Sequence, residues 1–165
     1  MWKQVAAAAA ISAGLAGCAS SAGTSPSGSA TVVPAASEAM DIGLCGSEDA
    51  GDLDSALGVT GLEQISANPL RCAWAGPGDR PNYRVVFEWF RGSSLADRRG
   101  QVTGQASTVT VSGRSGIAWS GPTSCELAVD SGGQDFVDWT FTGTGAGPQC
   151  TALQHIAATT LAKAG

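Results

Sequence analysis

The chain has 165 residues, a length typical of one domain. Fourteen acidic and nine basic side chains give a formal net charge of -5, and charged residues make up only 14% of the chain. Nucleic-acid binding needs clustered Lys and Arg, so this balance argues against a nucleic-acid partner. Hydrophobic residues make up 43% of the chain, which permits a packed core and excludes wholesale disorder.

The N-terminal segment has the pattern of a secretory signal peptide. Lys3 supplies a positive charge, and an uncharged apolar run from Val5 to Ala16 follows it. That run is shorter than the roughly 20 residues with which a helix spans a bilayer, and no later segment is long enough either. We therefore predict a signal peptide over residues 1–17 and no transmembrane helix.

The segment Leu15-Ala16-Gly17-Cys18 resembles the lipobox of bacterial lipoproteins. The resemblance implies that residues 1–17 are a lipoprotein signal peptide and that Cys18 carries a diacylglycerol thioether and an N-acyl group. Several acyl chains anchor a protein stably, whereas a single chain binds a membrane only marginally. We expect anchoring at the outer, extracytoplasmic face of the cell membrane. An ordinary secretory signal that happens to contain a Cys is the alternative.

Residues 18–40 are predicted to be the lipidated Cys and a flexible tether. The tether is rich in Ser, Ala, Gly, Pro and Thr, and this composition buries too little apolar surface to offset the entropy of ordering it. Residues 41–165 then form the extracytoplasmic domain.

Within that domain, local patterns predict three helices and six strands. In chain order we expect a helix over residues 49–58, strands over 70–75 and 83–90, a helix over 94–100, strands over 108–111, 116–120, 125–130 and 135–142, and a helix over 150–163. Ser94 and Asp97 stand at the spacing of a capping box. The last helix is amphipathic, with one face formed by Leu153, Ile156, Ala157, Thr160 and Leu161.

These elements indicate an α+β fold. The strands follow one another without crossover helices, so the sheet should be mostly antiparallel. We expect the helices to pack on one side of the sheet and two disulfides to stabilise the domain.

The four cysteines after Cys18 lie in the exported part of the chain, where disulfides persist. No two of them stand at the close spacing of a zinc site or of a redox-active pair. Three connectivities are open to four cysteines. We favour Cys45–Cys72 and Cys125–Cys150, because each pair joins the start of a helix to a neighbouring strand across a modest loop.

Arg91, Arg98 and Arg99 form the one local basic cluster and are candidate contacts for an anion, such as a lipid phosphate. The alternative is structural: Arg98 and Arg99 compensate the C-terminal end of a short helix and pair with Glu88 or Asp97. Four tryptophans are expected in the core rather than in a stacking platform for a ligand: Trp74, Trp89, Trp119 and Trp139.

No set of residues predicts catalysis or a cofactor. Ser93 and Ser94 follow a strand as in a nucleophile elbow, but the only His, His155, is predicted to face solvent. Asp135 and Asp138 are paired carboxylates without an evident substrate cleft.

No pattern predicts a metal site either. The acidic stretch from Glu48 to Asp54 lacks the ligand pattern of a calcium loop. Acidic residues at the start of a helix are explained by their interaction with its dipole.

The predicted domain resembles the LprB/LprC-type lipoproteins of mycobacteria and their relatives, a family described only as a domain of unknown function. The matching pieces, in order, are Cys45-Gly46, Val59-Thr60-Gly61, Cys72-Ala73-Trp74, Phe87-Glu88-Trp89-Phe90-Arg91-Gly92-Ser93, Asp97-Arg98-Arg99, Cys125-Glu126, Asp135-Phe136-Val137-Asp138-Trp139 and Cys150. Relatives can carry Pro directly before the last Cys, whereas Gln149 stands there in this chain. The resemblance implies a lipid-anchored domain with two disulfides and brings no known activity.

From the sequence we therefore expect a non-catalytic binding domain. Its ligand would be a small molecule or a lipid, or its partner would be a membrane protein. The alternative is a structural or interaction lipoprotein of the cell envelope. A cavity enclosed between sheet and helices would favour a carrier, whereas a filled core with an exposed apolar patch would favour an interaction protein.

Overall fold

The computed structural model describes residues 38–78, 81–144, 146 and 149–165. Its elements are the 3-10 turn η1 (Leu44–Ser47), the helices α1 (Ala50–Leu57), α2 (Leu95–Gln101) and α3 (Gln149–Lys163), and the strands β1 (Glu63–Asn68), β2 (Arg71–Ala75), β3 (Tyr83–Phe90), β4 (Ser107–Val111), β5 (Arg114–Gly121), β6 (Ser124–Gly132) and β7 (Asp135–Gly143). The predicted signal peptide over 1–17, Cys18 and nearly all of the predicted tether lie outside the described residues.

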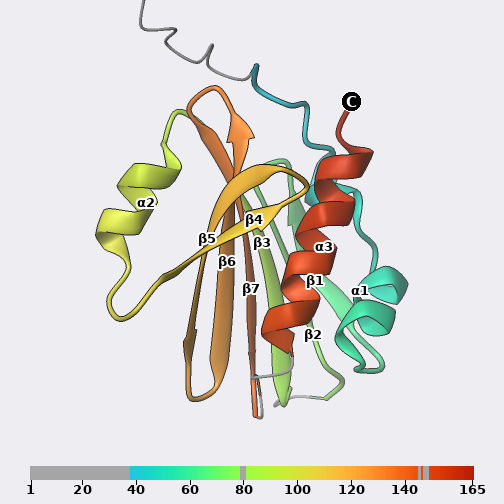
Figure 1. The fold of residues 1–165 in the computed structure, drawn as a ribbon. Helices are drawn as coiled ribbons and strands as arrows, with labels where there is room; N and C mark the ends of the chain where they lie inside the picture. The colour runs from blue at the N-terminus through green and yellow to red at the C-terminus, as the bar shows by residue number, and fades with distance from the viewer. Residues whose placement is uncertain (1–37, 79–80, 145, 147–148) are drawn as a thin grey trace, which may run out of the picture. The chain divides into compact units, whose positions relative to one another are not determined.

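The strands form one seven-stranded sheet in the order β1-β2-β3-β7-β6-β5-β4, and every neighbouring pair is antiparallel. Two meanders, β1-β2-β3 and β4-β5-β6-β7, meet where β3 pairs with β7. The predicted α+β fold with an antiparallel sheet is therefore confirmed. The chain must cross from β3, inside the sheet, to β4 at the far edge, and α2 lies in that connection (Figure 1).

The main core lies between one face of the sheet and the helices α1 and α3. Its centre is aromatic: the Trp139 ring is stacked 5.9 Å from Trp74 and lies 5.0 Å from Phe87, and all three side chains are fully buried. Burying a large apolar side chain contributes about 1.5–3 kcal/mol. The buried residues of α3 are the five that were predicted from its periodicity.

Gly46 shows how closely η1 approaches this core. Its φ is +68°, and a Cβ built there would lie 3.0 Å from Trp139 and 3.1 Å from both Phe87 and Thr160. A side chain would thus meet both backbone strain and packed rings, so only glycine fits this position.

The prediction that all helices pack on one side of the sheet is wrong for α2. A second apolar cluster on the opposite face contains Ile117, Ala128 and Phe136, and Leu95 and Val102 at the two ends of α2 pack against it. Figure 1 shows α2 and α3 on opposite sides of the sheet. The sequence patterns did not reveal this second cluster, because the same face also carries charged residues.

The strand β1 and the short turn η1 were not predicted from the sequence. All residues of β1 are exposed, and the register of the β1–β2 pair shifts between Gln64 and Ser66. An edge strand with no buried face has no period-two hydrophobic pattern, and the irregularity at Ile65 would have interrupted one. The three helices and the other six strands agree with prediction to within two residues at each end.

Candidate functional site

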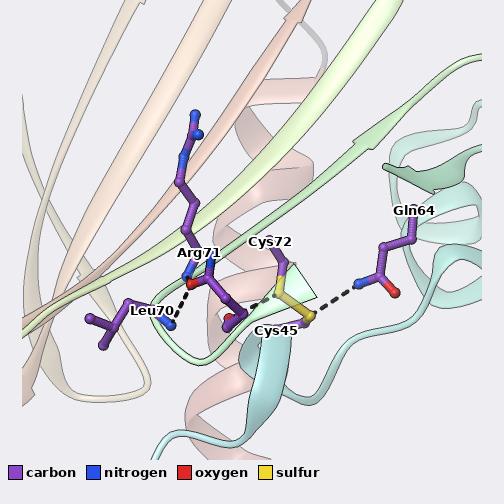
Figure 2. Close-up of a disulfide and its surroundings, with 6 residues drawn as sticks. Cys45, Gln64, Leu70, Arg71 and Cys72 are labelled. Carbon is purple, nitrogen blue, oxygen red and sulfur yellow. Dashed lines mark hydrogen bonds between the residues drawn. A yellow bond between two sulfur atoms is a disulfide. The ribbon is translucent and has the colours of Figure 1, made fainter. Parts of the chain in front are cut away.

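Cys45 and Cys72 form a disulfide that connects η1 to β2, with their Cα atoms 5.3 Å apart (Figure 2). This pairing confirms one of the two predicted bridges. Gln64 of β1 donates from Nε2 to Cys45 Sγ at 3.0 Å, and the Arg71 amide donates to Asn68 Oδ1 at 2.8 Å in the β1–β2 turn. The bridge therefore holds η1 against the first hairpin.

Cys125 and Cys150 lie next to each other but are free thiols in the structure. Cys125 is buried on β6, Cys150 is half-buried at the start of α3, and both thiols donate to the carbonyl of Ala146, at 3.4 and 3.6 Å. Burial, together with the adjacent Cys150 side chain, raises the pKa of the Cys125 thiol. The domain thus has one bridge and one adjacent thiol pair, and the second predicted disulfide stays a prediction.

The three arginines of the basic cluster point to different partners. Arg91 stacks on Trp89 at 4.8 Å and pairs with Asp135 at 3.6 Å, and its side chain is 62% exposed. Arg99 is exposed and donates to the Thr108 hydroxyl at 3.0 Å. Neither contact saturates a guanidinium, so their role as anion contacts stays a prediction.

Arg98, the third arginine, has a structural position instead. It stacks over Trp119 at 5.0 Å, donates from Nε to Asp138 Oδ2 at 3.2 Å, and pairs with Glu126. All of these partners lie on the sheet, so the side chain fastens α2 to it. We call Arg98, Glu126 and Asp138 the buried triad after Asp138, its one buried member, since the Arg98 and Glu126 side chains are 22% and 21% exposed.

The predicted structural alternative, in which the helix arginines pair with Glu88 or Asp97, is wrong for Arg98. Glu88 pairs with Arg71 at 3.0 Å, across the β2–β3 ladder. Asp97 closes the capping box with Ser94 at the start of α2, which confirms that predicted cap. Both carboxylates are therefore engaged by nearer groups.

The buried triad places the Asp138 carboxyl group where its charged form is unfavourable. Asp138 is only 2% exposed and lies beside Glu126, while its Oδ1 has no hydrogen-bond partner among the described residues. Burial raises the pKa of Asp138 well above its usual range, Glu126 and Glu88 raise it further, and Arg98 lowers it. The pair of carboxyls that the fold brings together is thus Glu126 and Asp138, and not Asp135 and Asp138.

The predicted tryptophan core is confirmed for two of the four rings. Trp74 and Trp139 are fully buried. Trp89 and Trp119 are half-buried instead, and each ring lies under an arginine guanidinium.

The only histidine does not meet a serine of the predicted elbow. Ser94 caps α2 on one side of the sheet, whereas His155 is exposed on α3 on the other side. The fold therefore separates the two residue types that a serine nucleophile and its base would need.

The helices α1 and α3 pack side by side, and a hollow lies between them (Figure 1). It is an open groove of about 530 Å³. Its lining consists of Glu48, Asp52, Ser55, Ala56, His155, Ile156, Thr159 and Lys163. We call it the α1–α3 groove. Six of these eight side chains are polar or charged, and Ala56 and Ile156 supply apolar surface.

A lysine and two carboxylates form the polar end of the α1–α3 groove. Lys163 donates to the Ser47 carbonyl at 2.9 Å, to Glu48 at 3.0 Å and to Asp52 at 3.1 Å. Burial raises the pKa of Glu48 despite the hydrogen bond from Lys163. Burial acts to lower the pKa of Lys163, but the hydrogen bonds to Glu48 and Asp52 raise it overall.

The sequence showed the acidic stretch from Glu48 to Asp54 but did not predict that part of it lines a groove. The residues of the acidic stretch have different roles. Asp49 caps α1 by accepting from the Asp52 amide at 2.9 Å, and Asp54 accepts from two backbone amides beyond the helix. Among the described residues no cluster of His, Cys, Asp and Glu could hold a metal ion. Lys163 meets Glu48 across most of the folded chain, so no local signal could reveal the contact.

None of the helices in the described part of the chain is long and apolar enough to cross a membrane. No curated protein and no solved structure matches the sequence. Residues 13–163 match the family described as Protein of unknown function (DUF3558). This match covers nearly all of the described domain, including the disulfide, the buried triad and the α1–α3 groove, and the chain belongs to the DUF3558 family.

Proposed function

We propose that this chain is a lipid-anchored extracytoplasmic protein that binds a small ligand in the α1–α3 groove without catalysing a reaction. The observation that carries the proposal is the groove itself. Its volume, about 530 Å³, lies within the range of roughly 300–1,000 Å³ that is usual for small-molecule sites. The sheet–helix core is filled by Trp74, Phe87 and Trp139, which favours a ligand at the surface over a lipid held between sheet and helices.

The groove proposal is tested by extracting the full-length protein from membranes in mild detergent and identifying co-purifying small molecules by mass spectrometry. Ala56→Trp introduces an indole into the groove wall. Ala96→Trp, on the exposed face of α2, is the matched control. We expect a molecule that accompanies the wild type and Ala96→Trp but not Ala56→Trp. A preparation in which all three proteins carry the same molecules, or none, would contradict binding in the groove.

The anchoring part of the proposal rests on the lipobox residues and on the resemblance to LprB/LprC-type lipoproteins. Cys18 supplies the sulfur that the lipid would modify. We predict that Cys18→Ser abolishes acylation and leaves the precursor unprocessed. Labelling of growing cells with an alkyne fatty acid measures the effect, and Cys150→Ser is the control for loss of another thiol. Undiminished label on the Cys18 variant would contradict the prediction.

We further propose that Cys125 and Cys150 form the second disulfide in the oxidising compartment outside the membrane. Both thiols donate to the same carbonyl oxygen, that of Ala146, so the two side chains are adjacent and little movement separates the thiol pair from a bridge. We predict that a non-reducing peptide map of the exported protein contains a Cys125–Cys150 peptide and no free thiol, because the sulfur of Cys18 is a thioether in the lipidated protein. A mixed bridge such as Cys72–Cys125, or two alkylatable thiols, would refute it.

A second candidate function, interaction with another protein of the cell envelope, is favoured by the edge of the sheet. Three large hydrophobic side chains in and beside the first hairpin are exposed: Leu44 by 59%, Ile65 by 54% and Leu70 by 50%. The edge strand β1 also presents main-chain groups that a partner strand can pair with. Ile65→Lys should remove a protein cross-linked to the wild type in cells, whereas Ser107→Lys on the opposite edge strand should not.

A further inference from the structure

Three oxygen atoms converge on the Lys163 ammonium and form a cradle for a protonated amine. They are the Ser47 carbonyl oxygen at the end of η1, Glu48 Oε2 in the following loop and Asp52 Oδ2 in the first turn of α1, at 2.9, 3.0 and 3.1 Å. Each distance is that of a good hydrogen bond, and an ammonium has three donors to match them. We call these three oxygens the ammonium cradle.

The residues of the cradle have acceptor capacity that Lys163 does not use. The Glu48 side chain lines the groove and is only 3% exposed, yet its Oε1 has no hydrogen-bond partner among the described residues. A buried polar atom without a partner is unfavourable, because it has lost its water and gained nothing in return. A ligand donor that reaches Glu48 Oε1 would therefore gain a hydrogen bond that Lys163 leaves unmade.

Lys163 is also the most easily displaced part of this arrangement. It lies in the last turn of α3, and its side chain remains 35% exposed on a flexible four-carbon stem. Its pair with Asp52 is exposed, and an exposed ion pair contributes little stability. The groove continues from the cradle along Ala56 and Ile156, which offer apolar surface to the remainder of a ligand.

The charge of the groove decides between ligand classes. Two carboxylates face one ammonium, and all three donors of that ammonium are already used. An anionic ligand would be repelled by Glu48 and Asp52, whereas a cationic ligand is attracted by both carboxylates.

Resting on the proposed function of the groove, we propose that its ligand carries a protonated primary amine beside an apolar group, and that this amine takes the place of the Lys163 ammonium in the cradle. Lys163 is then an internal competitor that occupies the site until the ligand arrives. This assignment makes a signed prediction: removal of Lys163 should strengthen binding, and removal of the Glu48 charge should weaken it.

The test uses the ¹⁵N-labelled full-length protein in nonionic detergent micelles, titrated with benzylamine and followed through the backbone amide signals of Ser55 and Thr159. Benzyl alcohol and benzoate are matched neutral and anionic probes. Lys163→Met should bind benzylamine about tenfold more tightly, equivalent to about 1.4 kcal/mol, and Glu48→Gln about tenfold more weakly. Arg84→Met, on the other side of the sheet, removes a positive charge without touching the groove and should bind as the wild type does.

The possible outcomes distinguish the amine assignment from the proposal that the groove binds a ligand. Benzoate shifts at Ser55 and Thr159 that disappear in Lys163→Met would overturn the amine assignment while leaving the groove a binding site. Equal affinities for benzylamine in the wild type and Lys163→Met would also overturn the amine assignment, because Lys163 and the ligand would then not compete for the cradle. Absence of any shift with benzylamine overturns it as well, and the extraction experiment with Ala56→Trp judges the groove independently. Lys163→Gln replaces Lys163→Met if the methionine variant does not give a folded amide spectrum.

Discussion

Replacing Cys45 and Cys72 together by Ala should lower the free energy of unfolding by about 3.5 kcal/mol, the loop-entropy contribution of a bridge across this separation. The bridge joins residues 27 positions apart, and both cysteines are buried, at 4% and 0% exposure. It holds η1 so that Gly46 meets Trp139 and Phe87, and it also connects the exposed first hairpin to the helical layer. Loss of the bridge therefore frees the unfolded chain and loosens one side of the core.

Denaturant unfolding measures this loss, with all proteins in a background in which Cys125 and Cys150 are Ala, so that only one bridge can respond. Addition of a reductant should bring the protein with Cys45 and Cys72 close to the double variant and leave the double variant unchanged. Coincident unfolding curves without reductant would show that the bridge contributes nothing to stability.

Arg98→Met should destabilise the domain by about 2–3 kcal/mol at neutral pH, because removing one partner of a buried ion pair leaves the others uncompensated. Arg98 is 22% exposed in its side chain, but Asp138 is only 2% exposed and also lies near Glu126. The methionine side chain preserves much of the apolar contact with Trp119, so the loss reports mainly on charge. Arg84→Met, an exposed arginine on the neighbouring part of the sheet, is the matched control and should cost little.

The pH dependence of this variant has a definite sign. Burial and the neighbouring carboxylates raise the folded-state pKa of Asp138 above its usual value, and Arg98 opposes that rise. A raised acid pKa stabilises the fold below the unfolded pKa, and this stability is lost as the pH rises through the folded pKa. Without Arg98 the loss is greater, so the gap between wild type and Arg98→Met should be small near pH 4 and widen toward pH 7.

Asp138→Asn provides the complementary test within the same cluster. An amide at this position can still accept from Arg98 and donate to Glu126, but it carries no charge to bury. Asp138→Asn should therefore reverse part of the loss in Arg98→Met at pH 7 and have little effect near pH 4. Thermal unfolding of the single and double variants at both pH values measures the coupling. Additive losses at pH 7 would show that Arg98 and Asp138 act independently.

The local elements could be predicted because their causes act within a few residues of the chain. The capping box of Ser94 and Asp97 is a contact across three positions, and the structure contains it. The buried face of α3 follows from helical periodicity. The alternation of Val137, Trp139 and Phe141 likewise indicated the face of β7 that packs in the main core.

Only the tertiary structure decided which groups meet. The sheet order sends the connection from β3 to β4 across β7, β6 and β5. In the fold α2 crosses on the face opposite α3, and Arg98 meets Asp138, 40 positions away. The α1–α3 groove depends on Lys163 and Glu48, 115 positions apart. A single sequence carries periodicity and spacing over a few residues, whereas these contacts depend on the order in which strands pair. The sequence by itself therefore determined the helices and most strands and favoured one cysteine pairing that the structure confirms, whereas only the tertiary structure decided the buried triad and the groove.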